Sequence, residues 1–299
     1  MVALTRPEGP APEDFTPSRR LALGSLFFAG YAVSALSAEA APITTDAAGL
    51  VTFEAQIPQR DGPLPAYVAH PARPGRAPVV LVVPEVFGIH EYIRDTCRRL
   101  AKQGYVAVAT DFFHRAGDPA PLTDFPAIQK IVATATNEQV MGDIAATLAW
   151  VKRQPFADPR RAAITGFCWG GAVVWMAVDR FPDLDAGVAW YGRLTAPKPD
   201  QFLGTERRPW PVDVAGQLRA PVLGLYAGKD QGIPLADVRL MQAALRTTGK
   251  TRSNIVVYPD ATHGFHADYR GSYNAAAAQD GWRRMLAHFA GAGVVGQPV

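Results

Sequence analysis

The stretch Gly166-Phe167-Cys168-Trp169-Gly170-Gly171 decides the fold of this 299-residue chain. It follows a short apolar run, Ala162–Thr165, and precedes a helical pattern that extends to about Arg180. A strand that turns this sharply into a helix leaves no room for a Cβ two residues before or after the central position, where Gly166 and Gly170 stand. The stretch therefore has the form of a nucleophile elbow with cysteine in place of the more usual serine.

Cys168 occupies the position of the nucleophile in this turn. The elbow directs that side chain out of the sheet, and the positive end of the following helix favours a thiolate. The alternative is that Cys168 is a small buried hydrophobic residue, which is the most common situation for a free cysteine. The flanking glycines favour the nucleophile.

The rest of the chain alternates between strand and helix patterns. Val79–Val83 is a continuous apolar run, as expected for a strand buried on both faces of a parallel sheet. Thr52–Ile57 and Leu64–His70 alternate in polarity on either side of a turn and predict an antiparallel hairpin at the sheet edge. We expect further strands at Tyr105–Thr110, Gly187–Tyr191, Val222–Ala227 and Ile255–Tyr258, and helices at Ile93–Gln103, Asn137–Arg153, Pro234–Thr247 and Tyr273–Phe289.

This alternation predicts one α/β domain over residues 41–299: a doubly wound, mostly parallel sheet with an antiparallel N-terminal edge. Ligands of such sheets bind beyond the C-terminal ends of the strands. Asp230 follows Val222–Ala227, and His263 follows Ile255–Tyr258. Nucleophile, acid and histidine is the chain order of α/β-hydrolase triads, so we expect His263 to move the proton and Asp230 to orient the imidazole.

Val79–Val83 ends in Pro84-Glu85-Val86-Phe87-Gly88. A loop at this place supplies one oxyanion donor, so we predict the backbone N–H groups of Val86 and Trp169 as the pair. Glu85 beside a cysteine could accept its proton, or it is a solvated loop acid or helix cap. Tyr191 closes another strand and either lines the pocket or packs in the core.

Composition excludes several other classes of protein. The net charge is only +3 and the basic residues are scattered, so no nucleic-acid-binding stripe is present. The two cysteines, Cys97 and Cys168, are too few for a disulfide framework and lack the spacing of a zinc site. We therefore expect no metal site and no nucleic-acid partner. We further expect a small-molecule substrate and a monomer or a homodimer.

The N-terminal forty residues have the pattern of an export leader. Ser18-Arg19-Arg20-Leu21 precedes an uncharged run to Ala38, and Ala38-Glu39-Ala40 resembles a cleavage site. We predict a twin-arginine signal over residues 1–40, a periplasmic mature chain that starts near Ala41, and no stable membrane span in it. A retained membrane anchor, or a leader with no targeting role in a cytoplasmic protein, is the alternative.

Taken together, the Pro84–Gly88 loop, the cysteine elbow, Asp230 and His263-Gly264-Phe265 resemble the dienelactone hydrolase family, from about Val51 to Phe289. The resemblance implies carboxymethylenebutenolidase-like opening of a lactone through an acyl-enzyme, without a cofactor. It also implies that Glu85 partners the resting thiol.

Two features depart from that family. Its arginines hold the substrate carboxylate, one of them a few residues beyond the histidine, whereas Arg270 stands here at a different offset and Arg115 is the other candidate. An export signal is also unusual for this family. The same triad would suit a thioesterase or an acyl-transferase, and an exported binding protein without turnover is the non-enzymatic alternative.

Overall fold

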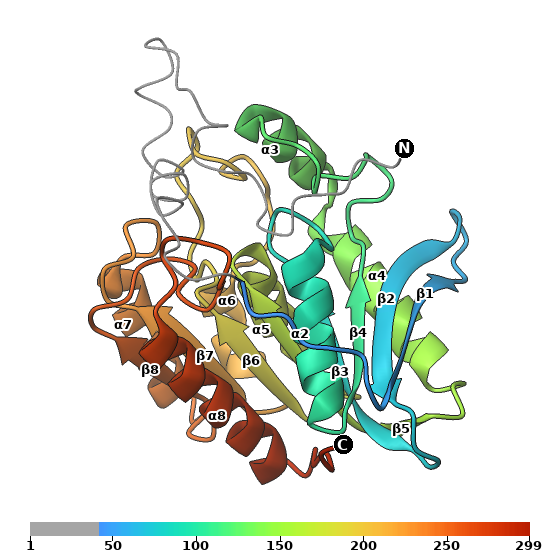
Figure 1. Cartoon of the computed structure of the whole chain (residues 1–299). Coiled ribbons are helices and arrows are strands. Elements are labelled where there is room, and N and C mark those ends of the chain that lie inside the picture. Colours follow the sequence, from blue (N-terminus) through green and yellow to red (C-terminus); the bar gives the residue numbers. More distant parts are fainter. Residues whose placement is uncertain (1–41) are drawn as a thin grey trace.

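The computed structural model describes residues 42–299, which build an eight-stranded sheet with helices on both faces (Figure 1). The strand order is β1-β2-β4-β3-β5-β6-β7-β8. β1 (Leu50–Ile57) pairs antiparallel with β2 (Leu64–Pro71), and β2 pairs antiparallel with β4 (Val106–Thr110). All other pairs are parallel, so the predicted α/β sheet with an antiparallel N-terminal edge is confirmed. The predicted leader, residues 1–40, lies outside the described residues.

Helices α2 and α8 lie across one face of the sheet, and α4 and α5 across the other (Figure 1). Residues of the central parallel strands are almost all buried, which explains their continuous apolar sequences. The other strands are β3 (Ala77–Val83), β5 (Ala157–Phe167), β6 (Ala186–Trp190), β7 (Val222–Ala227) and β8 (Asn254–Tyr258). The helices are α2 (Glu91–Lys102), α3 (Phe125–Thr134), α4 (Asn137–Val151), α5 (Trp169–Arg180), α6 (Pro211–Val214), α7 (Leu235–Thr247) and α8 (Ala275–Gly291).

Polar ends of buried aromatic side chains fix α5 and β6 in the core. Trp175 of α5 donates to the hydroxyl of Tyr226 at 3.2 Å, and Trp190 of β6 donates to Oγ1 of Thr165 at 3.1 Å. A buried indole N–H without a partner would cost free energy. These two hydrogen bonds therefore allow the large rings of Trp175 and Trp190 to be buried beneath the elbow. The helix that follows Cys168 is thereby held rigidly against the sheet.

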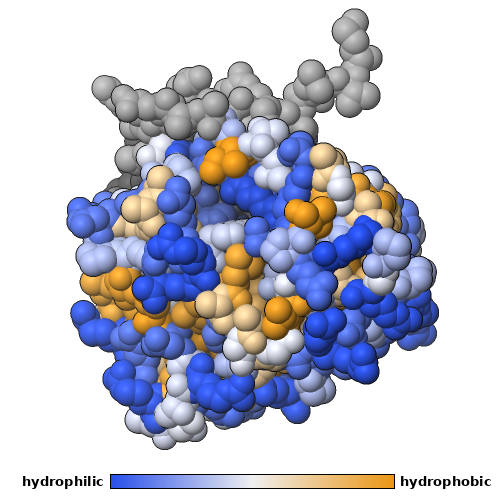
Figure 2. Space-filling model, turned by 60° about the horizontal axis from the view of Figure 1, so that its bottom comes forward, coloured by the Kyte–Doolittle hydropathy of each residue, from blue (hydrophilic) through white to orange (hydrophobic). Residues whose placement is uncertain are grey.

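One face of the domain is predominantly hydrophilic. Figure 2 shows this face, on which hydrophobic residues form separate groups among hydrophilic ones. Within residues 42–299, no helix has both the length and the apolar character needed to cross a bilayer.

The parallel strands place the predicted site at one edge of the sheet. β3, β5, β7 and β8 run in the same direction, so the segments that follow them meet at their C-terminal ends. These segments are the Pro84–Gly88 loop, the elbow, the Asp230 turn and the loop that begins at His263.

Candidate active site

The backbone at Cys168 has the strained conformation that a nucleophile elbow requires. Its φ is 56° and its ψ −115°, directly between β5 and α5. A Cβ on Gly166 would lie 2.3 Å from the carbonyl oxygen of Gly170, and a Cβ on Gly170 would lie 2.4 Å from that of Val83. Backbone atoms cannot rotate away as side chains do, so glycine is required at both positions.

His263 and Asp230 form a buried pair beyond the ends of β8 and β7. Nδ1 of His263 donates to Oδ2 of Asp230 at 2.7 Å. The other carboxylate oxygen accepts the backbone N–H groups of Gly232 and Ile233 at 2.8 and 3.0 Å, which fixes the carboxylate plane. Burial alone would lower the pKa of His263, but attraction to Asp230 and the contact with Cys168 raise it to about 10.

Aromatic rings surround the elbow on two sides. Tyr191, buried and with φ 40°, presents its ring to the edge of the His263 imidazole, 5.1 Å between centroids. Trp169 packs against Phe112 and Phe113, with centroids 5.8 and 5.0 Å away. These two phenylalanines follow β4, and their contact with the elbow was not predicted from the sequence.

Glu85 is fully buried and is the centre of a second polar cluster. Its Oε2 accepts a hydrogen bond from the Tyr269 hydroxyl at 2.6 Å and lies 3.7 Å from Nε2 of His90. Burial would raise the pKa of Glu85, but the charge of Arg270 and the contacts with His90 and Tyr269 lower it to about 2. Glu85 is therefore neither a solvated loop acid nor a helix cap.

Arg270 joins the same cluster from the loop that follows His263. Its Nε donates to the Tyr269 hydroxyl at 3.1 Å, and its Nη2 lies 3.9 Å from Oε1 of Glu85. The guanidinium also stacks over the Phe87 ring, 4.8 Å from the centroid. Burial opposes its charge, yet interactions with Tyr269, Glu85 and Cys168 raise the pKa of Arg270 above its ordinary value. The structure thus gathers Cys168, His263, Glu85 and Arg270 at one site.

Comparison with known proteins shows the family of the chain. The model of the dienelactone hydrolase family matches residues 64–292, which is most of the chain. The chain belongs to the dienelactone hydrolase family. It is accordingly a hydrolase of esters or lactones, and its substrate is a small molecule.

Several members of the family are close in sequence. A protein of Methylorubrum extorquens, assigned as a carboxymethylenebutenolidase, is 47% identical over 93% of this chain and 94% of its own length. A protein of Escherichia coli with the same assignment is 44% identical over 87% of this chain and 94% of its own. The crystal structure of a protein assigned as a dienelactone hydrolase, from Klebsiella pneumoniae, superposes with a TM-score of 0.76 at 45% identity, covering 81% of this chain and 98% of the other.

Arg115 has different partners from the other predicted site residues of the chain. Its guanidinium binds Asp143 of α4 at 2.9 and 3.0 Å, Asp61 of the β1–β2 turn at 2.6 Å and Gln59 at 2.8 Å. All three guanidinium nitrogens of Arg115 thus form hydrogen bonds, which connect α4 with the turn between β1 and β2. These contacts give Arg115 a structural role and lend no support to the predicted binding of a substrate carboxylate.

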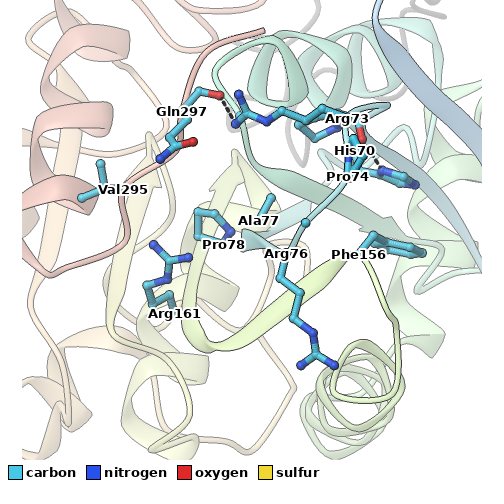
Figure 3. Close-up of a pocket in the computed structure, with 13 residues that line it drawn as sticks. His70, Arg73, Pro74, Arg76, Ala77, Pro78, Phe156, Arg161, Val295 and Gln297 are labelled. Atoms are coloured by element: carbon cyan, nitrogen blue, oxygen red, sulfur yellow. Dashed lines mark hydrogen bonds between the residues drawn. The ribbon is translucent and has the colours of Figure 1, made fainter.

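An enclosed pocket of about 190 Å³ lies at the opposite edge of the sheet (Figure 3). Its wall includes Ala77 and Pro78, which begin β3, and Phe156, which precedes β5 and stacks on His70 at 4.1 Å. Arg73 is held there by the carbonyl oxygen of Gln297 at 2.5 Å. Because this pocket lies at the N-terminal ends of the strands, it is not part of the site around Cys168.

Proposed function

We propose that the chain cleaves a carboxylic ester or lactone through a Cys168-His263-Asp230 triad and an acyl-enzyme intermediate. The observation that carries this proposal is the buried His263–Asp230 pair, beside a cysteine whose backbone has the strained geometry of a nucleophile elbow. An inert buried thiol would require neither the strain nor the pair.

The pKa values in the site favour His263 over Glu85 as the group that holds the proton of the thiol. A pKa of about 10 places a proton on His263 at neutral pH, whereas a pKa of about 2 keeps Glu85 ionised. Cys168 then reacts as a thiolate beside an imidazolium. In this scheme Glu85 holds Tyr269 and Arg270 in place, and its influence on the thiol acts through them.

The reaction follows from these positions. The Cys168 sulfur attacks the carbonyl carbon, and the resulting oxyanion accepts hydrogen bonds from the backbone N–H groups of Val86 and Trp169. The C–O bond then breaks, and the leaving oxygen takes the proton of His263. Water attacks the thioester, His263 takes a proton from that water, and the acid product leaves as the thiolate re-forms.

Arg270 is the better of the two predicted arginines for a substrate carboxylate. Its Nη1 is buried without a hydrogen-bond partner among the described residues, as is Oε1 of Glu85. Buried polar atoms of this kind need a partner, and a carboxylate would supply one to the guanidinium. Tyr191 packs on His263, so we assign it to orienting the imidazole within the substrate pocket.

A first experiment compares hydrolysis of p-nitrophenyl acetate by the chain and by Cys168→Ala. We expect a loss of at least about 1,000-fold in kcat/KM, because the acyl-enzyme cannot form. Cys97→Ala is the matched control: Cys97 is the other cysteine of the chain, lies fully buried in α2 and should be dispensable. Equal rates for the chain and Cys168→Ala would refute the nucleophile. Parallel assays with a thioester separate hydrolase from thioesterase activity.

A further inference from the structure

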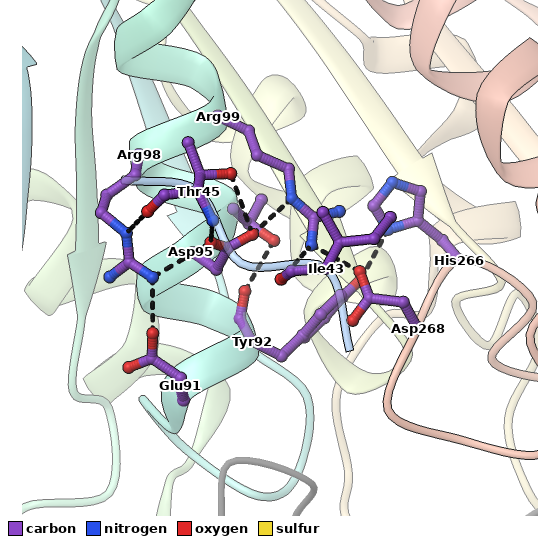
Figure 4. Close-up of polar contacts among 10 residues, drawn as sticks. Ile43, Thr45, Glu91, Tyr92, Asp95, Arg98, Arg99, His266 and Asp268 are labelled. Atoms are coloured by element: carbon purple, nitrogen blue, oxygen red, sulfur yellow. Dashed lines mark hydrogen bonds and ion pairs between the residues drawn. The ribbon is translucent and has the colours of Figure 1, made fainter. Parts of the chain in front are cut away.

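The segment Ile43–Ala48 docks on α2 through its backbone (Figure 4). The N–H of Thr45 donates to Oδ1 of Asp95 at 2.5 Å, and its hydroxyl donates to Oδ2 at 3.3 Å. The carbonyl oxygen of Thr45 accepts from Nε of Arg98 at 2.8 Å. Asp95 is only 2% exposed, so this carboxylate is buried and needs these donors.

Arg99 connects that segment to the loop that carries the catalytic histidine. Its Nε donates to Oδ2 of Asp95 at 2.5 Å, and its Nη2 contacts both Asp268 and the carbonyl oxygen of Ile43. Figure 4 shows the guanidinium between the two carboxylates. One side chain of α2 therefore joins the N-terminal segment, its own helix and the loop that begins at His263.

Asp268 directly precedes Tyr269 and Arg270, the two residues that contact Glu85. A second bond ties the same loop to α2, because Nδ1 of His266 lies 2.6 Å from the Tyr92 hydroxyl. α2 itself follows the Pro84–Gly88 loop and begins at Glu91. The helix thus connects the Glu85 loop with the loop of Tyr269 and Arg270.

Arg99 is the cation that two buried carboxylates share. Asp268 is 3% exposed, and burial together with Asp95 raises its pKa while Arg99 opposes that rise. If Arg99 lost its charge, Asp95 and Asp268 would face each other with less compensation, although Arg98 also contacts Asp95 at 3.0 Å. The expected response is protonation or displacement of Asp268, which would move the residues that follow it.

We propose that Arg99 and Asp268 are positioning residues of the reaction: their ion pair, braced by Asp95 and the segment Ile43–Ala48, holds Tyr269 and Arg270 against Glu85 and within reach of Cys168. This rests on the proposed function for the role of Cys168. Neither residue touches the substrate. They act by fixing where the Arg270 charge lies.

The test compares Arg99→Gln and Asp268→Asn with Arg99→Lys, which restores the charge. Arg94→Gln is the matched control, since Arg94 lies on the same helix but pairs with the exposed Glu54. Activity is measured on mono-p-nitrophenyl succinate, which has a free carboxylate, and on p-nitrophenyl butyrate, which has none. We expect KM for the succinate to rise about tenfold in the first two variants, with a smaller change for the butyrate, because a shift of about 1 Å costs binding and rate. Arg99→Lys should recover part of the loss.

A second readout does not depend on turnover. The pH profile of Cys168 alkylation by iodoacetamide should move to higher pH by about half a unit or more in Arg99→Gln and Asp268→Asn, because the cation near the thiol is displaced. Equal losses on both esters with an unmoved alkylation profile would overturn the proposal. If Arg99→Gln does not fold, Asp268→Asn and Arg99→Lys decide by the same measurements. Full activity of Cys168→Ala would refute the proposed function separately. In that case the alkylation profile would still show whether Arg99 and Asp268 hold Arg270 near Cys168.

Discussion

At the scale of single residues, the site depends on how closely the backbone packs at the elbow. A Cβ on Gly170 would lie 2.4 and 2.6 Å from the carbonyl oxygens of Val83 and Pro84, which precede the predicted oxyanion donor Val86 by three and two residues. We expect Gly170→Ala to cost about 2 kcal/mol in the free energy of unfolding and to reduce ester hydrolysis more than stability alone explains. Urea unfolding and steady-state kinetics measure the two effects.

Gly142 provides the control for that substitution. It also lies inside a helix, α4, but a Cβ there would meet no atom within 4 Å. Gly142→Ala should therefore stabilise the chain by about 0.5–1 kcal/mol and leave the kinetics unchanged. Similar effects of the two substitutions would show that the elbow tolerates a larger residue.

Residues of the site differ in how far the sequence reveals them. Cys168 could be predicted because two glycines and a strand-to-helix change lie within a few residues, and Asp230 and His263 because each follows a strand. The partners of Glu85 could not be predicted. Its bond with Tyr269 joins positions 184 residues apart, and nothing in the local pattern says which loops meet. In the sequence, Arg115 and Arg270 are both candidates for binding a substrate carboxylate. Only their contacts in the structure distinguish them.

At the scale of elements, strands and helices with strong periodicity were predicted and weakly patterned ones were not. Helix α4 begins at Asn137, as predicted, and the hydroxyl of Thr136 caps it by accepting the N–H of Gln139 at 3.3 Å. The Gln139 side chain donates to the carbonyl oxygen of Phe112. α3 was not predicted, although its start has two signals of a helix, the cap Asp124 and Pro126 in the first turn.

The Thr136 cap carries a prediction of its own. Thr136→Ala should lower the free energy of unfolding by about 1 kcal/mol, because the N–H of Gln139 loses its acceptor. Thr134→Ala is the control, since Thr134 is exposed and ends α3, and its hydroxyl donates to the Ile131 carbonyl oxygen rather than capping a helix. We expect a change within about 0.5 kcal/mol there. If both substitutions changed the free energy of unfolding in urea by the same amount, the Thr136 cap would not stabilise the start of α4.

At the scale of the whole molecule, the pKa values of two buried histidines shift in opposite directions, and His266 contributes to the pH dependence of stability on the acid side. Burial and the nearby Arg99 lower the pKa of His266 from 6.5 to about 3, whereas Asp230 and Cys168 outweigh burial and raise that of His263 from 6.5 to about 10. Below pH 6.5 the unfolded chain binds a proton at His266 that the folded chain refuses. The proton that the folded chain holds on His263 comes from the Cys168 thiol in the proposed resting state. Between pH 6.5 and the ordinary thiol pKa of about 8.5, the folded and unfolded chains therefore bind the same number of protons at this pair.

Stability should therefore fall as the pH drops below 6.5, with His266 contributing up to about 1.4 kcal/mol per pH unit. Glu85, with its pKa lowered from 4.5 to about 2, adds to the fall only below pH 4.5, where its stabilising charge is lost. His266→Asn should reduce the slope of stability between pH 6.5 and 4.5. Free energies of unfolding in urea across this range measure that slope. If the free energy of unfolding of His266→Asn depended on pH below 6.5 as strongly as that of the unchanged chain, His266 would not be the group that stays unprotonated in the folded chain.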